Sequence, residues 1–471
     1  MIAISVILLI GCFIGFVLVW KGQQSQQLVT PFMVIASFEI LWTWPASIYS
    51  QVIDVSDAYP AILMALAFCT FLAGYRIAVG SVRVIRAQIR SFSDRPIERD
   101  YSEAAYLVTI VAAGTVLFFL GRYLHEGLPP ITRTLIDLWR GSDHATAVGE
   151  LSTARESMKG YYFDTGVYRG QGAILTMLQV GWPYLSLMAF LLFKATKRRA
   201  WLVTLGITLL MSVWFVGATG QRTPVVMVFV YLAIGVSYCK RLKATGLLRT
   251  IAGILIIAFL VTPFSGQLVG DIGDDNFIST VMDKATRRIL LGDGITVIEI
   301  VRFIEDGALS YGYGRIHLEK FLTALPGVTY GIPFSMQLQA LSGAESKTAF
   351  RSTTYFGVLY ADFGPIGVVA FYALIGMFAG KAQNYLFQTR KYISSLPART
   401  FVTLYSSALV LGSSVSMMAS LFVVMLFFAS VKTCLVISDG FRFGIAHRPM
   451  DRRTTLVSPH AFRDPGWQKT F

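Results

Sequence analysis

Hydrophobic residues in this chain come in long unbroken blocks. The first three cover residues 2–20, 30–49 and 60–79, each close to the length that a helix needs to cross a bilayer core. Charged residues make up only 14% of the chain, against about 25% in soluble domains. The pattern predicts an all-α polytopic membrane protein, with the lipid bilayer as its first partner.

We expect about eleven transmembrane helices in a single transmembrane domain, residues 1–438, followed by a basic cytoplasmic tail, residues 439–471. No Lys or Arg precedes the first block, so we expect a retained helix rather than a cleaved signal peptide. The later spans are expected over residues 104–121, 171–193, 200–218, 223–239, 247–264, 356–380, 400–415 and 418–437. The four cysteines lie in or beside apolar blocks, so no disulfide framework or thiolate metal site is indicated.

Basic residues cluster in every second loop. Such clusters follow the spans that end near residues 79, 193, 239, 380 and 437. The positive-inside rule then puts the N-terminus outside and the C-terminus in the cytoplasm. The net charge of +14 is explained by these loops, and nucleic acid is not expected as a partner.

Two long loops fall on the opposite, outer side. Residues 122–170 and 265–355 are mixed in charge and rich in Gly, Tyr and Pro. Loops of this length are usually functional. Helical spacing of apolar residues at 280–306 and 315–325 predicts short helices in the second loop.

Arg222, in TGQRTPVVMV, stands at the outer junction of two apolar blocks. One interpretation is an arginine whose head reaches lipid phosphates. The other is a fixed guanidinium that binds an anionic ligand, with Gly220 allowing close backbone approach.

Further basic residues lie on the same side, and several of them converging on one cavity would suit a pyrophosphate. A solvated loop with internal ion pairs is the alternative. The residues are Arg287 and Arg288 in KATRRILLGDG, Arg315 in YGYGRIHLEK, and Lys347 and Arg351 in ESKTAFRSTTYFG.

Three other features of the outer side carry weaker chemical signals. His317 is a candidate general base, although a surface histidine on an amphipathic helix is the common alternative. Asp271, Asp274 and Asp275 could hold a divalent cation, but their spacing fits no specific metal loop, and we expect no metal site. No zinc motif, Walker loop or Ser/His/Asp pattern is present.

The stretch FRSTTYFGVLYADFGPIGVVAFYALIGMFAGK combines glycines, aromatic residues and one carboxylate. The glycines suit close helix packing in lipid. Tyr355 and its aromatic neighbours suit an interfacial belt, or a surface for a lipid tail or sugar. Neither feature explains Asp362, one turn into an apolar span, and an intramembrane carboxylate is a functional or pairing candidate.

TGQRTPVV at the end of one span, a long outer loop, and STTYFGVLYADFGPIGVV opening the next span together resemble bacterial Wzy-type oligosaccharide repeat-unit polymerases, which make O-antigen and exopolysaccharide. The resemblance implies a GT-C-like glycosyltransferase without cofactor or metal. By position, the family's outer arginine corresponds to Arg222, and its loop arginines correspond to Arg351 and to Arg287 or Arg288.

The resemblance also implies the reaction. A growing glycan would pass from undecaprenyl pyrophosphate to the non-reducing end of a second lipid-linked repeat unit, on the periplasmic side of the bacterial cytoplasmic membrane. A flippase and a chain-length regulator would be candidate partners. Arg222, Arg351, Arg288 and His317 are then the expected catalytic residues. Arg287, Arg315, Tyr355, Lys347, Gly220 and Asp362 are the expected substrate-binding residues.

Two other functions stay open, besides a non-enzymatic sensor or scaffold. An O-antigen ligase-like transferase would use the same donor with another acceptor. A lipid-linked oligosaccharide flippase or other transporter would be a non-enzymatic alternative, for which internal repeats or a charged path at mid-membrane depth are expected.

Overall fold

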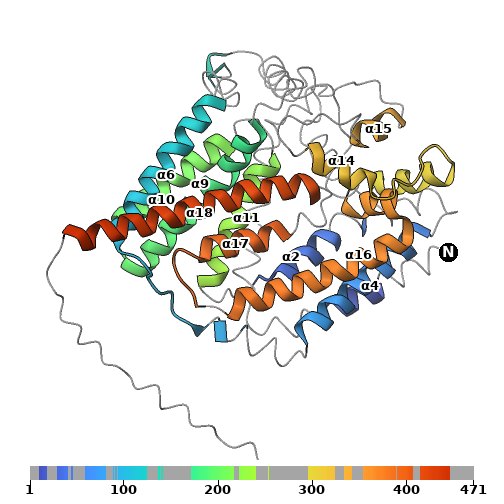
Figure 1. Ribbon diagram of the computed structural model, residues 1–471, viewed down its shortest axis with the longest axis horizontal. Coiled ribbons are helices and arrows are strands. Elements are labelled where there is room, and N and C mark those ends of the chain that lie inside the picture. Colours follow the sequence, from blue (N-terminus) through green and yellow to red (C-terminus); the bar gives the residue numbers. More distant parts are fainter. Residues whose placement is uncertain are drawn as a thin grey trace, which may run out of the picture.

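The structure is a computed structural model of the 471-residue chain. It describes residues 10–17, 29–40, 44–45, 59–80, 89, 91–92, 94–124, 136–137, 139–141, 171–216, 222–239, 253, 295–323, 334–341, 354–388, 390–406 and 414–445. These parts are helical, apart from loops and one isolated β-bridge between Glu98 and Tyr392 (Figure 1).

Within the described residues, six helices are long and apolar enough to cross a membrane. They are α4 (Tyr59–Val79), α6 (Glu103–Leu124), α9 (Gln171–Thr196), α10 (Arg199–Val216), α16 (Tyr355–Gln388) and α18 (Ser414–Ile445). Each coincides with a predicted block, so the multi-pass, all-helical architecture is confirmed at this level.

Three further predicted spans overlap helices outside this group of six. The block at 223–239 forms α11 (Arg222–Cys239), and the block at 30–49 contains the eight-residue α2 (Pro31–Phe38). The block at 400–415 overlaps α17 (Leu396–Tyr405), which begins four residues earlier. The predicted span 247–264 lies outside the described residues except at residue 253. The expected boundary at 438 falls inside α18, which continues to Ile445.

Helices α4 and α16 lie side by side and form one half of the molecule (Figure 1). Their backbones touch because glycines remove the side chain at the contact. A Cβ at Gly376 would lie 2.1 Å from the carbonyl oxygen of Phe71, and one at Gly74 would lie 2.1 Å from that of Ala373. The glycines of the late span therefore act in helix packing, as the sequence predicts.

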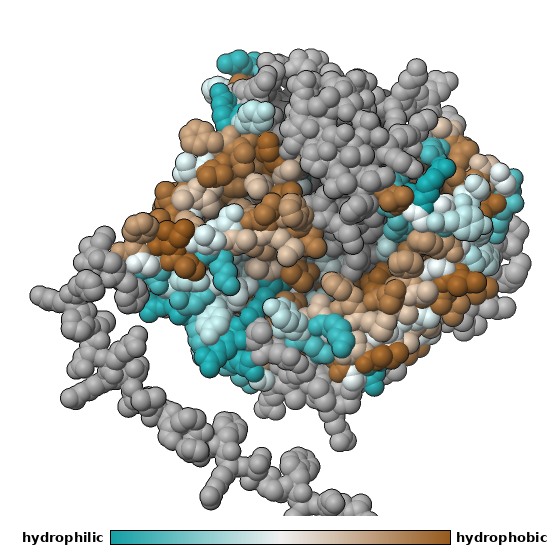
Figure 2. Space-filling model, in the orientation of Figure 1, coloured by the Kyte–Doolittle hydropathy of each residue, from teal (hydrophilic) through white to brown (hydrophobic). Residues whose placement is uncertain are grey.

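Helices α6, α9, α10 and α18 form a second group. α9 is the buried member, with Leu185, Leu187 and Met188 fully enclosed. The outer members expose large apolar side chains, which appear as the brown surface in Figure 2. Those on α6 and α10 include Val111, Val116, Phe119, Val203, Ile207 and Leu210. An apolar exterior around a buried core is the surface that a lipid environment favours.

Polar contacts tie several segments together at one end of the bundle, which we call the basic face. Glu103 accepts from Arg198 at 3.1 Å and from the indole of Trp201 at 2.6 Å. Asp439 of α18 accepts from the backbone N–H of Ser102. The N-terminal ends of α6 and α10 and the C-terminal part of α18 therefore meet here.

α16 is two helices rather than one. Gly364 has φ 66° and ψ −166°, which a residue with a side chain rarely adopts, and Pro365 follows it. The ring centroids of Phe356 and Tyr372 lie 6.0 Å apart, although sixteen residues of straight helix would separate them by about 24 Å. The short first helix therefore folds back against the long second one. This corrects the expectation of one continuous span over residues 356–380.

The short helices predicted in the second long loop are confirmed where the structure describes them, at residues 295–305 and in α14 (Arg315–Thr323). A third short helix, α15 (Phe334–Leu341), was not predicted. The buried carboxylate of Glu319 in α14 accepts from the N–H of Phe334 at the start of α15. α14 packs against α16 and α18 at the end of the bundle opposite the basic face, which we call the site face.

Candidate functional site

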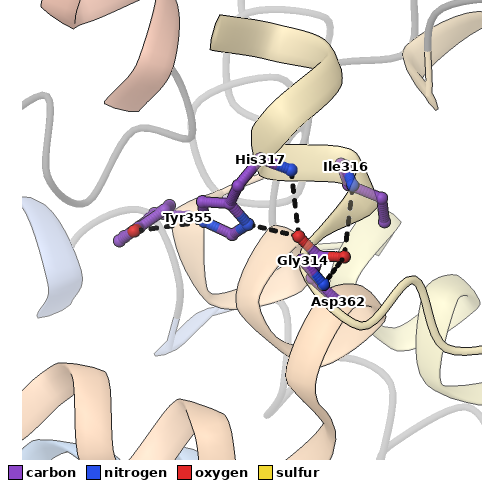
Figure 3. A network of polar contacts seen from close by, with 5 residues as sticks. All are labelled: Gly314, Ile316, His317, Tyr355 and Asp362. Atoms are coloured by element: carbon purple, nitrogen blue, oxygen red, sulfur yellow. Dashed lines mark hydrogen bonds and ion pairs between the residues drawn. The ribbon is translucent and has the colours of Figure 1, made fainter.

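Asp362 is fully buried in the last turn of the short helix of α16, just before the break at Gly364. Its Oδ1 accepts from the backbone N–H groups of Gly314 at 2.8 Å and Ile316 at 3.2 Å. Its Oδ2 accepts from the N–H of His317 at 2.9 Å. The carboxylate thus caps the N-terminus of α14, where the helix dipole stabilises negative charge (Figure 3).

The chain around residue 312 is shaped to reach this carboxylate. The N–H of Gly312 donates to the carbonyl of Ala361 at 2.9 Å, and that of Tyr313 donates to the carbonyl of Asp362 at 2.7 Å. A Cβ on Gly312 would lie 2.3 Å from Oδ1 of Asp362. Only glycine lets the loop come this close without displacing the carboxylate.

His317 completes the arrangement with its side chain. Its Nδ1 lies 2.5 Å from Oδ2 of Asp362, and its Nε2 lies 3.2 Å from the hydroxyl of Tyr355. An ionised carboxylate only accepts, so Nδ1 is the donor in this contact, and in the neutral imidazole Nε2 then keeps a lone pair. The His317 side chain is 19% exposed whereas that of Asp362 is fully enclosed, so the imidazole can be reached from outside and the carboxylate cannot.

Aromatic rings surround the imidazole. The His317 ring centroid lies 5.2 Å from that of Phe363, 5.7 Å from that of Tyr355 and 6.2 Å from that of Phe371. Phe363 and Phe371 come from opposite sides of the helix break and stack on each other. Apolar walls lower the local dielectric and strengthen the interaction between the imidazole and Asp362.

Three of the predicted site residues therefore meet. His317, Asp362 and Tyr355 form one contact network, although they were singled out for separate reasons. Asp362 is not one turn into a continuous span, as expected, but at the end of the folded-back helix. Arg315 begins α14 and its side chain is exposed.

The other predicted residues are not described to the same extent. Arg222 is the first residue of α11, but only its backbone is described. Gly220, Arg287, Arg288, Lys347 and Arg351 lie outside the described residues, as do Asp271, Asp274 and Asp275. Their roles stay predictions. Among the residues that are described, no group of three or more His, Cys, Asp and Glu side chains could hold a metal ion.

Two features of this region were missed from sequence. Glu39, directly after α2, is buried and accepts from the hydroxyl of Tyr372 at 3.1 Å. A lone Glu inside the block 30–49 was the signal for it. The alternation of Tyr and Gly in YGYG, residues 311–314, could have indicated a loop folded tightly against another segment.

The arrangement has the elements of general base catalysis. A buried carboxylate fixes the orientation and tautomer of an imidazole, and the second imidazole nitrogen points at a hydroxyl. A substrate hydroxyl that took the place of the Tyr355 hydroxyl could lose its proton to Nε2. Asp362 would stabilise the resulting imidazolium.

Comparison of the chain with protein-family models, curated proteins and solved structures found no match.

Proposed function

We propose that this protein is a membrane glycosyltransferase that polymerises lipid-linked oligosaccharide repeat units. It would transfer a growing glycan from undecaprenyl pyrophosphate to the non-reducing end of a second lipid-linked unit. The observation that carries the proposal is the imidazole of His317, held by Asp362 at Nδ1 and turned toward a hydroxyl at Nε2. The resemblance of TGQRTPVV and STTYFGVLYADFGPIGVV to Wzy-type polymerases supports it.

The proposed chemistry begins at the acceptor sugar. Its hydroxyl donates to Nε2 of His317, the proton moves to the imidazole, and the oxygen forms a bond to the anomeric carbon of the donor. The bond from that carbon to the pyrophosphate breaks, and the pyrophosphate oxygen keeps the electron pair. The transition state resembles an oxocarbenium ion.

The leaving pyrophosphate gains negative charge, so cations near it lower the barrier more than they stabilise the ground state. Arg222, Arg351 and Arg287 or Arg288 are the proposed cations. Arg315, at the start of α14 and two residues before His317, is exposed, which suits a contact to the lipid-linked substrate. By loop charge the basic face is cytoplasmic, and the site face would then be periplasmic.

An O-antigen ligase-like transferase would run the same steps with another acceptor. A transporter is the second candidate, and two observations favour it. α16 is broken beside a buried carboxylate, and Glu39 is a second buried carboxylate next to α16. Broken helices and buried charges mark binding sites in many transporters.

Reconstitution separates these functions. The purified protein is placed in liposomes that contain synthetic undecaprenyl-pyrophosphate-linked repeat units, and the glycans are analysed on a gel. A ladder of multiples supports the polymerase. Transfer only to added lipid A core identifies a ligase. No product, together with movement of the repeat unit to the leaflet reached by an impermeant glycosidase, identifies a transporter. We expect Arg222→Ala to insert normally and give no ladder.

A further inference from the structure

Four tyrosine rings form a row next to the site. The ring centroids lie 6.3 Å apart for Tyr313 and Tyr311, 6.0 Å for Tyr311 and Tyr360, and 6.4 Å for Tyr360 and Tyr59. The row joins the loop before α14, the short helix of α16 and the start of α4. Both ends of the row are exposed, Tyr313 by 85% and Tyr59 by 37%, whereas Tyr360 between them is 2% exposed.

The inner part of the row is held in place. Side-chain hydrogen bonds join Tyr360 to Tyr311 and to Tyr59. The ring of Tyr311 lies over the helix break, 3.3 Å from where a Cβ of Gly364 would be. Tyr311 therefore cannot move independently of the turn that carries Asp362.

Tyr313 is unusual in conformation as well as in exposure. Its φ of 49° lies in the left-handed region, which is unfavourable for a residue with a side chain. Its N–H donates to the carbonyl of Asp362, so its backbone is tied to the residue that orients His317. Its ring contacts that of Tyr311, but at 85% exposed it gains little burial to offset this conformation.

A ligand on the ring of Tyr313 would supply such burial. An aromatic face carries partial negative charge and attracts the C–H side of a sugar ring, while the phenol can form hydrogen bonds. Tyr313 lies four residues before His317, in the loop that leads into α14.

We propose that Tyr313 and Tyr311 form a stacking subsite for a pyranose ring of the glycan whose hydroxyl His317 activates. This inference rests on the proposed function. The subsite would position the acceptor sugar over the loop before α14, so that its hydroxyl meets Nε2 of His317. Tyr313 is a binding residue in this account and takes no part in proton transfer.

The test uses the repeat-unit oligosaccharide, released from its lipid by mild acid, and the full-length protein in detergent. Dissociation constants are measured by titration calorimetry. Loss of one stacking face is expected to weaken binding by about tenfold, by analogy with aromatic stacking on other rings. Tyr313→Ala should show this loss, whereas Tyr313→Phe should stay within about threefold of wild type because the ring is retained.

Two further variants separate binding from structure. Tyr123, near the end of α6, is 69% exposed, and Tyr123→Ala controls for a general role of interfacial tyrosines. Tyr313→Gly relieves the unfavourable φ, so we expect it to raise the melting temperature while it weakens sugar binding. A purely structural Tyr313 would not produce that opposite pair of effects.

The results also separate this inference from the proposed function. Undecaprenyl pyrophosphate without sugar should bind wild type and Tyr313→Ala equally. If wild type polymerises and Tyr313→Ala binds the oligosaccharide as wild type does, the subsite is wrong and the polymerase stands. If Tyr313→Ala loses sugar binding but wild type forms no ladder, the subsite stands and the polymerase is wrong. An equal loss in Tyr123→Ala would overturn the subsite.

Discussion

Asp362 on the site face and Asp100 on the basic face each accept several hydrogen bonds, yet their donors differ in kind. Asp100 accepts from the hydroxyls of Tyr106 and Ser394 and from the N–H of Ser394. These groups belong to α6 and to the loop before α17, so the contacts join segments. Asp362 accepts from backbone N–H groups and from an imidazole with a second nitrogen.

The difference separates a structural contact from a chemical one. The hydroxyls around Asp100 stay protonated near neutral pH, so the cluster can hold segments but cannot exchange protons. The imidazole beside Asp362 has a second ring nitrogen that can accept a proton from a substrate hydroxyl. A buried carboxylate is therefore informative about function only together with the partner that it orients.

The largest expected effect is on the site face. Asp362→Asn should lower turnover by about 10³-fold, within the range for loss of general base catalysis. The NH₂ group of the Asn side chain would face backbone N–H groups that now donate to the carboxylate, and the imidazole of His317 would lose its fixed orientation. The measurement is polymerisation rate per folded, monodisperse protein. Asp306→Asn, on an exposed residue of the same loop, is the matched control. If Asp362→Asn turns over at the wild-type rate, Asp362 has no more chemical role than Asp100.

Gly312→Ala should have a smaller effect of the same type. The new Cβ would meet Oδ1 of Asp362, so the loop and the imidazole must shift, and misplacement of about 1 Å costs roughly 10²-fold in rate. The rate is measured with the same assay. Gly440→Ala is the control, since nothing lies within 4 Å of a Cβ at that position. Equal activity of the two variants would show that the close approach is not needed.

On the basic face, Asp100→Asn should affect stability and leave turnover unchanged. The Asn amide accepts weaker hydrogen bonds than the carboxylate, and its NH₂ group would face one of the groups that now donate to Asp100. We expect the free energy of unfolding to fall by about 1–3 kcal/mol. Thermal unfolding in detergent measures the loss, and the polymerisation assay at low temperature measures turnover of the folded protein. A specific loss of turnover without a change in unfolding temperature would contradict a purely structural role.

Lys391 gives the smallest effect and a defined pH dependence. It is buried on the basic face with its Nζ 4.6 Å from the ring centroid of Phe92. Burial is the largest cause that lowers the pKa of Lys391 to about 8. Cys239 and Asp94 oppose this shift, and Arg95 and Arg399 add to it.

Because the reference pKa is 10.5, the folded state binds fewer protons than the unfolded state between about pH 8 and 10.5. Stability contributed at this position therefore rises with pH across that window. Lys391→Met removes the titration, so the melting temperature of wild type relative to this variant should rise by about 2–4 °C from pH 7 to pH 9.5. If the difference in melting temperature between wild type and Lys391→Met is the same at pH 7 and pH 9.5, the lowered pKa of Lys391 is contradicted.

Much of the helical framework follows from the sequence. α4, α6, α9, α10, α16 and α18 coincide with apolar blocks, because block length and low charge are local properties. The fold-back of α16 does not follow from hydropathy, which stays high on both sides of Gly364. The pair Gly364-Pro365 is the local signal for the break, but it does not give the direction of the turn.

The sequence identified individual residues of the site but not the contacts between them. His317 stood out as a titratable group and Asp362 as a charge in an apolar stretch. Their contact joins positions 45 residues apart and depends on the loop at Gly312 and on the break at Gly364. Such contacts arise from tertiary packing, so no spacing in the sequence encodes them.

The most direct test of the account is the single-turnover rate of His317→Asn with lipid-linked repeat units. The Asn amide can replace Nδ1 as donor to Asp362, so the fold should survive, but no group remains at the position of Nε2. We predict a melting temperature near that of wild type and a rate lower by about 10²–10⁴-fold. A rate within threefold of wild type, in a variant that still binds the oligosaccharide, would contradict His317 as the base.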